Sequence, residues 1–338
     1  MQTSRTYDLG PTQLFVEAQS GDLLAGFERF LGDRGRGDRG RGDRDRGDRG
    51  RQGAGAGTFR VTIRTGEPEP LPADAVLLYS GPLPNEGSCD FARAGQAYVM
   101  AFPGQARMVV DPGGRRADIV VSPDHPWRAC GSVVPISVEF ALDLDGQQVV
   151  HAAGLSAPDG KGMVLISAPS GTGKTTTALA LARAGLSLAA DDIMVLRREN
   201  AGIVAWALPR ALNVHRRTAA LLPWLMLPPR WNSEGEQVVP RASLGSSIVL
   251  EDGELPVSRL LLLQRGDRFA MEPVAAAEAL AALAADNVRG STAGILPLQQ
   301  RRFDMLADLV EIVSTKRVTI PDGLAGVDAL AKWLTEEG

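Results

Sequence analysis

A short glycine-rich segment near the middle of the chain has the residue types of a phosphate-binding loop. Residues 168–175 read APSGTGKT, which follows the pattern G-x-x-x-x-G-K-[ST] with alanine at the first position. Glycines at 171 and 173 would let backbone N–H groups turn toward a polyphosphate, and the dipole of a following helix would point to the same place. We therefore predict a nucleotide site formed by Ala168, Pro169, Ser170, Gly171, Thr172, Gly173, Lys174, Thr175 and Thr176.

Two side chains of this loop have individual predicted roles. Lys174 would contact the β- and γ-phosphates, and the hydroxyl of Thr175 would be a ligand of Mg²⁺. Magnesium takes hard oxygen ligands and usually keeps several waters beside the phosphate oxygens of its substrate. The loop therefore predicts ATP and Mg²⁺ as the bound groups.

Three further side chains are candidates for chemistry beside the loop. Asp191 and Asp192 follow the strand-like segment LSLAA and should emerge at the carboxyl edge of a parallel sheet, where ligands collect. One could orient magnesium and the other could accept a proton from an attacking hydroxyl, although such a pair could also cap a turn. His151 ends an apolar run, and a lone histidine there is more often a core residue than a catalytic one. His125 and His215 have less support.

The elements around the loop alternate in a way that indicates an α/β fold. An apolar strand over Met163–Ala168 is followed by the loop, a helix to Ala184 that Gly185 would cap, and a strand-like run over Leu186–Leu196. A strand, a helix and a strand in this order imply a parallel crossover unit. Farther on we expect a buried strand at Arg259–Gln264 and helices at Pro273–Ala285, Leu298–Ser314 and Gly326–Thr335.

The sequence before the loop divides into three parts. Residues 1–31 form an N-terminal segment, and residues 32–57 hold four copies of a GDRGR-like unit followed by QGAGAG. Because this repeat has no apolar side chain, we expect a solvated linker or insert; the alternative is RNA binding through its arginines. Residues 58–144 contain short alternating stretches separated by Gly, Pro and Asp, such as FRVTIR and ARMVV, and should be rich in strands. A catalytic domain would then occupy residues 145–336.

The composition limits the class of protein. The chain has 338 residues, 44% of them hydrophobic, a formal net charge of −4 and two cysteines. This balance gives no global positive field for nucleic acid or membranes, and so few cysteines argue against a disulfide framework or a zinc site. The N-terminus lacks a signal-peptide pattern, and no apolar run is long enough to span a membrane. We therefore expect a cytoplasmic protein, and we leave open a homo-oligomer.

Residues 151–196 resemble the catalytic core of HPr kinase/phosphorylase and of the HPr-kinase-related proteins. Three features carry the resemblance: a histidine before the loop strand, the S-G-x-G-K-[ST] loop, and the sequence Ala-Asp-Asp one helix and one strand later. The resemblance implies a P-loop core of the HPr kinase and PEP carboxykinase type. It also implies roles for Lys174 on phosphate, Thr175 on magnesium, Asp192 as proton acceptor, His151 as its assistant, and Asp191 as support for the metal or for Asp192.

The function implied is an ATP-dependent kinase that phosphorylates a hydroxyl on a protein, peptide or small molecule, with the hydroxyl of a serine as the expected acceptor. The Glu-containing signature rich in Arg and Gly that the HPr enzyme carries is absent between Asn200 and Leu255, which favours a relative with another acceptor. The alternatives are an inactive nucleotide-binding regulatory module, RNA binding through the repeat, and, more distantly, a carboxykinase.

Overall fold

The structure is a computed structural model and describes residues 2–32, 57–83, 87–156, 160, 162–200, 202–245, 248–288, 290–291, 294–295 and 297–336. The chain folds into two compact units. The first is Met1–Gly146 with Ser291–Gly294, and the second is Gln147–Gly290 with Ile295–Gly338. The repeat for which a linker or RNA binding was predicted falls on residues 33–56, outside the described residues.

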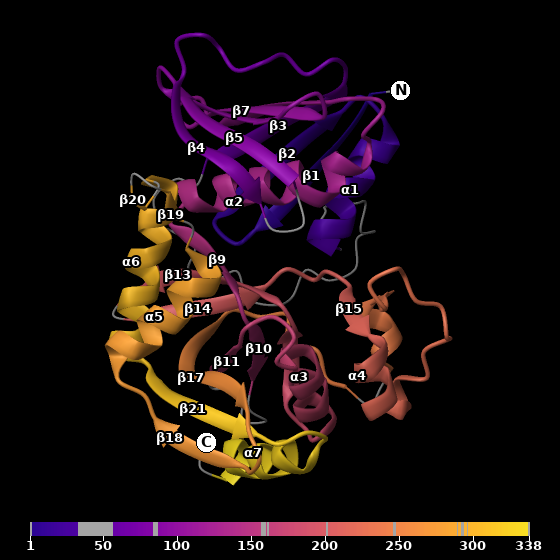
Figure 1. Cartoon of the computed structure of the whole chain (residues 1–338), viewed down its shortest axis with the longest axis vertical. Coiled ribbons are helices and arrows are strands. Elements are labelled where there is room, and N and C mark those ends of the chain that lie inside the picture. The colour runs from indigo at the N-terminus through magenta and orange to yellow at the C-terminus, as the bar shows by residue number, and fades with distance from the viewer. Residues whose placement is uncertain are drawn as a thin grey trace, which may run out of the picture. The chain divides into compact units, whose positions relative to one another are not determined.

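The first unit is an eight-stranded sheet with two helices on one face (Figure 1). Its order is β1-β2-β3-β8-β7-β6-β5-β4, and the neighbours are antiparallel except at β2–β3 and β3–β8. Alternate residues of β3, such as Val61 and Ile63, are buried while those between them are exposed, as expected for a sheet with one covered face. The elements are β1 (Thr3–Leu9), β2 (Thr12–Ala18), α1 (Gly21–Leu31), β3 (Thr58–Thr65), β4 (Val76–Leu83), β5 (Gly87–Ala94), β6 (Ala97–Phe102), β7 (Ala106–Asp111), β8 (Arg116–Val121) and α2 (Val134–Leu144).

The first unit differs from the sequence prediction at both of its ends. The segment before the repeat, which was given no structure, forms a hairpin and the amphipathic helix α1. The end of the region predicted to be rich in strands is the helix α2. Its run of apolar residues, VPISVEFAL, is mostly buried, and periodicity alone does not separate such a run from a buried strand.

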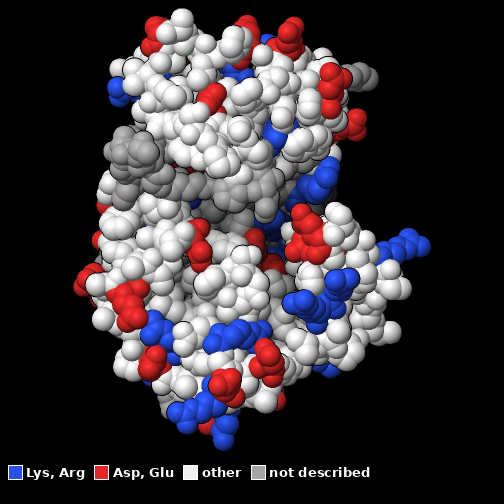
Figure 2. Space-filling model, viewed as in Figure 1, with Lys and Arg blue, Asp and Glu red and all other residues white. Residues whose placement is uncertain are grey.

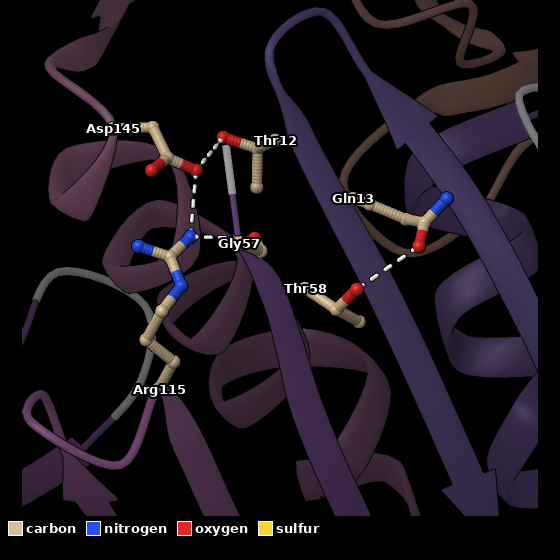
Figure 3. A network of polar contacts seen from close by, with 6 residues as sticks. All are labelled: Thr12, Gln13, Gly57, Thr58, Arg115 and Asp145. Atoms are coloured by element: carbon tan, nitrogen blue, oxygen red, sulfur yellow. Dashed lines mark hydrogen bonds and ion pairs between the residues drawn. The ribbon is translucent and has the colours of Figure 1, made fainter. Parts of the chain in front are cut away.

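A polar network joins distant parts of the first unit (Figure 3). Asp145, just after α2, accepts hydrogen bonds from the Thr12 hydroxyl at 2.6 Å and from the Arg115 guanidinium at 2.8 Å. The same guanidinium nitrogen of Arg115 donates to the carbonyl oxygen of Gly57 at 2.8 Å. The carboxylate thus joins the end of α2 to the start of β2 and to the turn before β8, and Arg115 extends the network to the residue before β3.

The second unit is built on a mixed sheet of nine strands. Seven of them run in the order β12-β10-β11-β17-β14-β13-β9, while β21 pairs with β17 and β18 pairs with β21. The strands β11, β17 and β21 are parallel. The strands are β9 (Gln147–His151), β10 (Ala153–Ser156), β11 (Met163–Ser167), β12 (Ser187–Ala190), β13 (Ile193–Glu199), β14 (Gly202–Ala207), β17 (Leu255–Arg265), β18 (Ala270–Pro273) and β21 (Ser314–Ile320).

Helices cover both faces of this sheet, so each face has its own hydrophobic core. Val164 and Ile166 of β11 point into a core shared with α3 (Lys174–Arg183) and α7 (Ala325–Glu336). Met163 and Leu165 point the other way, into a core shared with α5 (Ala276–Asn287) and α6 (Pro297–Ile312). Figure 1 shows α3 on one side of the strands and α5 and α6 on the other.

The run over Leu186–Leu196 was predicted as one strand but forms two, β12 and β13. The chain bends between them at Asp191 and Asp192, because β12 pairs with β10 whereas β13 pairs with β9 and β14. Both β11 and β12 are antiparallel to β10. The crossover from β11 through α3 to β12 is therefore parallel, as predicted, but β10 lies between the two strands.

A small subdomain packs beside α3. It consists of the hairpin β15 (Leu212–His215) and β16 (Glu236–Val239) with the short helix α4 (Arg216–Leu221) between them. Figure 2 shows Lys and Arg atoms over the part of the second unit where Figure 1 labels β15 and α4, with Asp and Glu atoms beside them. Among the helices that the structure describes, none is both long and apolar enough to cross a membrane.

Candidate phosphate-binding site

The glycine-rich loop joins the buried strand β11 to α3 and depends on two glycines. Gly171 has a φ of 79° and Gly173, directly before the helix, has a φ of 106°. Both lie in the left-handed region that side chains with a Cβ rarely adopt. A Cβ at Gly173 would also collide with a guanidinium nitrogen of Arg265. The backbone conformation therefore favours glycine at 173, and any other residue would also displace the Arg265 guanidinium.

Arg265 donates a hydrogen bond to the loop and was not among the predicted site residues. Its Nε donates to the carbonyl oxygen of Thr172 at 2.6 Å, and its Nη1 donates to that of Pro321 at 3.0 Å. Arg265 is the last residue of β17, which runs parallel to β11, so it emerges at the same edge of the sheet as the loop. A signal was present in the sequence, because the residue directly follows the predicted strand Arg259–Gln264.

Three predicted catalytic side chains meet beside the loop. The Nζ of Lys174 lies 2.5 Å from the Nε2 of His151 and 3.4 Å from the Oδ1 of Asp192. The Nδ1 of His151 lies 3.2 Å from the same carboxylate oxygen. Since Lys174 has only donors, its hydrogen bond assigns the acceptor role to Nε2 and leaves the proton of the neutral ring on Nδ1, facing Asp192.

The two adjacent aspartates have different surroundings. The side chain of Asp192 is 38% exposed, whereas Asp191 is only 6% exposed and accepts a hydrogen bond from the Thr175 hydroxyl at 3.0 Å. Burial, followed by the negative charge of Asp192, raises the pKa of Asp191 to about 6. The prediction that the two acids take different roles is consistent with this separation.

Burial also acts on the two basic groups of the site. It is the main cause that lowers the pKa of Lys174, against the attraction of Asp192. Burial likewise lowers the pKa of His151, and the positive charges of Lys174 and Arg210 lower it further, against the attraction of Asp192. The lowered pKa favours the neutral ring of His151 at pH 7, and the Lys174 ammonium is a cation held with little hydration.

The oxygen ligands beside the loop suit magnesium better than a metal ion whose ligands all come from protein side chains. The Thr175 hydroxyl and the Asp191 carboxylate offer two oxygen ligands side by side, and oxygen is the ligand type that Mg²⁺ prefers. Among the described residues there is no group of three or more His, Cys, Asp or Glu side chains placed to hold a metal ion. A magnesium ion here would complete its shell with water and phosphate oxygens.

A cavity of about 870 Å³ opens in front of these residues, within the second unit. It is lined by all of the predicted catalytic and metal-binding side chains and by most of the loop. Two loop residues serve the structure: the Ala168 side chain is buried in the hydrophobic core, and the Thr172 carbonyl accepts from Arg265. The cavity also reaches His215, for which the sequence gave little support, whereas His125 belongs to the first unit.

Asn287 holds His151 in place and was missed in the sequence. Its Oδ1 accepts a hydrogen bond from the backbone N–H of His151 at 2.6 Å, and its Nδ2 donates to the carbonyl oxygen of Leu283 at 2.9 Å. The side chain is 5% exposed at the end of α5. The contact joins residues 136 positions apart, so no local pattern could have indicated it.

Comparisons of the chain with protein families, curated proteins and solved structures identify a distant structural similarity. No protein-family model matches the chain, and no curated protein matches its sequence. Among solved structures, the chain is similar to the structure of the Hpr(Ser) kinase/phosphatase from Coxiella burnetii, with 14% sequence identity and a TM-score of 0.30 over 55% of this chain and 92% of that one. The identity and the TM-score are too low to transfer a function, so the functional conclusion depends on the residues of the cavity.

Proposed function

We propose that this protein is an ATP-dependent kinase that transfers the γ-phosphate to a hydroxyl, with the hydroxyl of a serine in a protein, peptide or small molecule as the natural acceptor. The observation that carries the proposal is the meeting of Lys174, His151 and Asp192 beside a glycine-rich loop in one cavity. These residues come from three separate stretches of sequence, and their convergence on one loop is the arrangement that binding and transfer of a phosphate group require.

The loop and the adjacent oxygens supply the binding part of the proposal. The backbone N–H groups at the start of α3 and the ammonium of Lys174 would hold the polyphosphate. Thr175 and Asp191 would hold Mg²⁺. When bound, the ion would neutralise charge on the β- and γ-phosphate oxygens, which is the main requirement of phosphoryl transfer. We propose a cytoplasmic location, because this compartment supplies both ATP and magnesium.

Asp192 and His151 supply the proton-transfer part. The acceptor hydroxyl attacks the γ-phosphorus, the bond from that phosphorus to the bridging oxygen breaks, and ADP leaves. The hydroxyl proton passes to the half-exposed Asp192 carboxylate, whose Oδ1 lies 3.2 Å from the Nδ1 of His151. His151 orients this carboxylate as a hydrogen-bond donor, and its own backbone is held by Asn287.

The test compares the wild type with Asp192→Asn and with Asp267→Asn, an exposed aspartate in the turn between β17 and β18. We expect Asp192→Asn to bind Mg²⁺ and ATP with near wild-type affinity by calorimetry but to lose most transfer of labelled phosphate to serine peptides. Asp267→Asn should behave as wild type. Full transfer by Asp192→Asn would disprove the base assignment, and ATP binding with no phosphorylated product from the wild type would favour a regulatory module that binds nucleotide without catalysis.

A further inference from the structure

Besides the loop, the cavity is lined by residues of the small subdomain. This lining, here called the β15–α4 wall, consists of Arg210, Ala211, Asn213, His215, Arg217, Thr218, Ala220, Leu221 and Glu236. It contributes two guanidinium groups, Arg210 and Arg217, against one carboxylate, Glu236. On the loop side, Lys174 is available to the phosphates while Arg265 is bonded to backbone carbonyls, and the carboxylates there are Asp191, Asp192 and Asp322. The wall has the opposite balance, with two guanidinium groups and one carboxylate.

The β15–α4 wall is fixed to the helix that follows the loop. The hydroxyls of Thr176 in α3 and Thr218 in α4 form a buried hydrogen bond of 2.8 Å. Leu212, Val214 and Leu222 pack into the same hydrophobic core as Leu179 and Ala182 of α3. Because these contacts are buried and specific, the distance from the wall to the loop is set by packing rather than by a hinge.

The two arginines differ in burial. Arg210 is half-buried, lines the same cavity as Asp192, and acts electrostatically on His151 and Asp191. Arg217 is exposed in the first turn of α4, where its backbone N–H donates to the Nδ1 of His215 at 3.1 Å. That contact anchors the start of the turn from which the Arg217 side chain lines the cavity.

Guanidinium groups select anions that have a planar fork of oxygens. A carboxylate can accept two parallel N–H bonds from arginine, which gives both strength and orientation. An acceptor whose hydroxyl lies at Asp192 could place a nearby carboxylate at Arg210, and a longer one could reach Arg217. Glu236 lies opposite His215 in the hairpin register, and it is the one carboxylate among the lining residues of the wall that the structure describes.

We propose that the acceptor carries a carboxylate close to the hydroxyl that is phosphorylated, and that Arg210 and Arg217 of the β15–α4 wall bind it. This inference rests on the proposed phosphotransferase function. The carboxylate could belong to a free hydroxy acid such as L-serine or to an acidic residue or C-terminus of a peptide. The recognition chemistry is the same in both cases.

The experiment measures kcat/KM of the full-length chain with labelled ATP and Mg²⁺ on matched acceptors. One arm compares L-serine with L-serinamide, and the other uses a library of serine peptides with all residue types beside the serine and with free or amidated C-termini. We expect the carboxylate form to be better by roughly 10–100-fold, the usual size of a charge-assisted contact. The arm that shows this ratio identifies the source of the carboxylate.

Arginine variants decide whether the wall causes the preference. Arg210→Gln and Arg217→Gln should reduce the ratio between acid and amide acceptors toward one, with the loss on the acid alone. Arg216→Gln is the matched control, because Arg216 is an exposed neighbour in the same helix that does not line the cavity; it should keep the wild-type ratio. A loss of transfer to both forms would instead indicate a role in nucleotide binding and would overturn the proposal.

The outcomes separate this inference from the function on which it rests. Phosphorylation of acid and amide acceptors at equal rates would overturn the carboxylate proposal while leaving the kinase intact. A ratio that survives in both Arg210→Gln and Arg217→Gln would also overturn it. ATP binding without product from any acceptor in either arm would reject the phosphotransferase proposal and this inference together.

Discussion

Two of the clusters of charged side chains, one in each unit, differ in how well their charges are matched. In the first unit, Asp145 faces the guanidinium of Arg115 and the hydroxyl of Thr12, and every contact is favourable. In the second unit, Asp191 lies buried next to a second carboxylate, and the buried ammonium of Lys174 is served by a histidine and a half-exposed acid. We expect the matched cluster to contribute to stability and the unmatched cluster in the cavity to serve the proposed binding of phosphate.

The largest expected effect comes from Lys174→Ala. Removing the ammonium should lower phosphate transfer by about 10²–10³-fold or more, because a preorganised charge is lost from the transferring phosphoryl group. Since burial already disfavours this cation, the free energy of unfolding should change by less than about 1 kcal/mol. Transfer assays and urea denaturation of the same variant check both expectations. A large loss of stability would place Lys174 with the structural cluster and break the comparison.

Asp191 makes the stability of the ligand-free protein depend on pH. Its pKa is raised from 3.8 to about 6 in the folded chain, so the folded state binds this proton more tightly than the unfolded state does. The resulting stabilisation is present below about pH 4 and is lost as the pH rises through 6, by roughly 3 kcal/mol at most.

Urea denaturation between pH 4 and pH 7, without nucleotide or magnesium, measures this contribution. In Asp191→Asn the decline with rising pH should be smaller than in the wild type, while the exposed control Asp267→Asn should retain it. Equal slopes in wild type and Asp191→Asn would show that the Asp191 carboxylate is not destabilised by its surroundings.

Asp145→Ala should reverse the pattern expected for Lys174→Ala, with a loss of stability and no change in nucleotide binding. It leaves the partly buried Arg115 and the buried Thr12 without their common acceptor, which should lower the free energy of unfolding by about 1–3 kcal/mol. Nucleotide affinity of the folded protein should be unchanged. Thr58→Val is a control, because it removes only the neighbouring partly buried hydrogen bond to Gln13 and should cost about 1 kcal/mol or less. Unchanged unfolding of Asp145→Ala would refute the structural role of the network.

The smallest effect separates the two glycines of the loop. A Cβ at Gly171 would contact no other atom, so Gly171→Ala should change the free energy only through its left-handed backbone, by about 1 kcal/mol. Gly173→Ala has that cost and also displaces the Arg265 guanidinium from its two carbonyl partners, so its nucleotide affinity should be lower by about a further 1 kcal/mol.

Calorimetric titration with Mg²⁺ and ATP measures the difference between the glycine variants. In the background Arg265→Ala the steric part disappears, and the two glycine substitutions should then have similar effects. If they already agree in the wild-type background, Arg265 does not restrict the loop.

Local sequence was sufficient to predict the loop and the elements that flank it. The apolar run of β11, the spacing of Gly171, Gly173 and Lys174, and Gly185 after the helix all act over a few residues. Gly185 indeed has a φ of 113°, as a left-handed cap requires. The approximate positions of β17, α5, α6 and α7 were likewise predictable from periodicity, with shifts of a few residues at their ends.

The sequence alone therefore determined where the glycine-rich loop lies and which residues are candidates for binding phosphate, because a loop's backbone conformation is a local property. Only the tertiary structure decided what surrounds them: Arg265 beneath the loop, Asn287 behind His151, and Arg210 and Arg217 on the opposite wall. It also decided that Asp191 is buried and Asp192 is not. These features depend on strand pairing and packing between distant segments, which impose no periodic pattern on the chain.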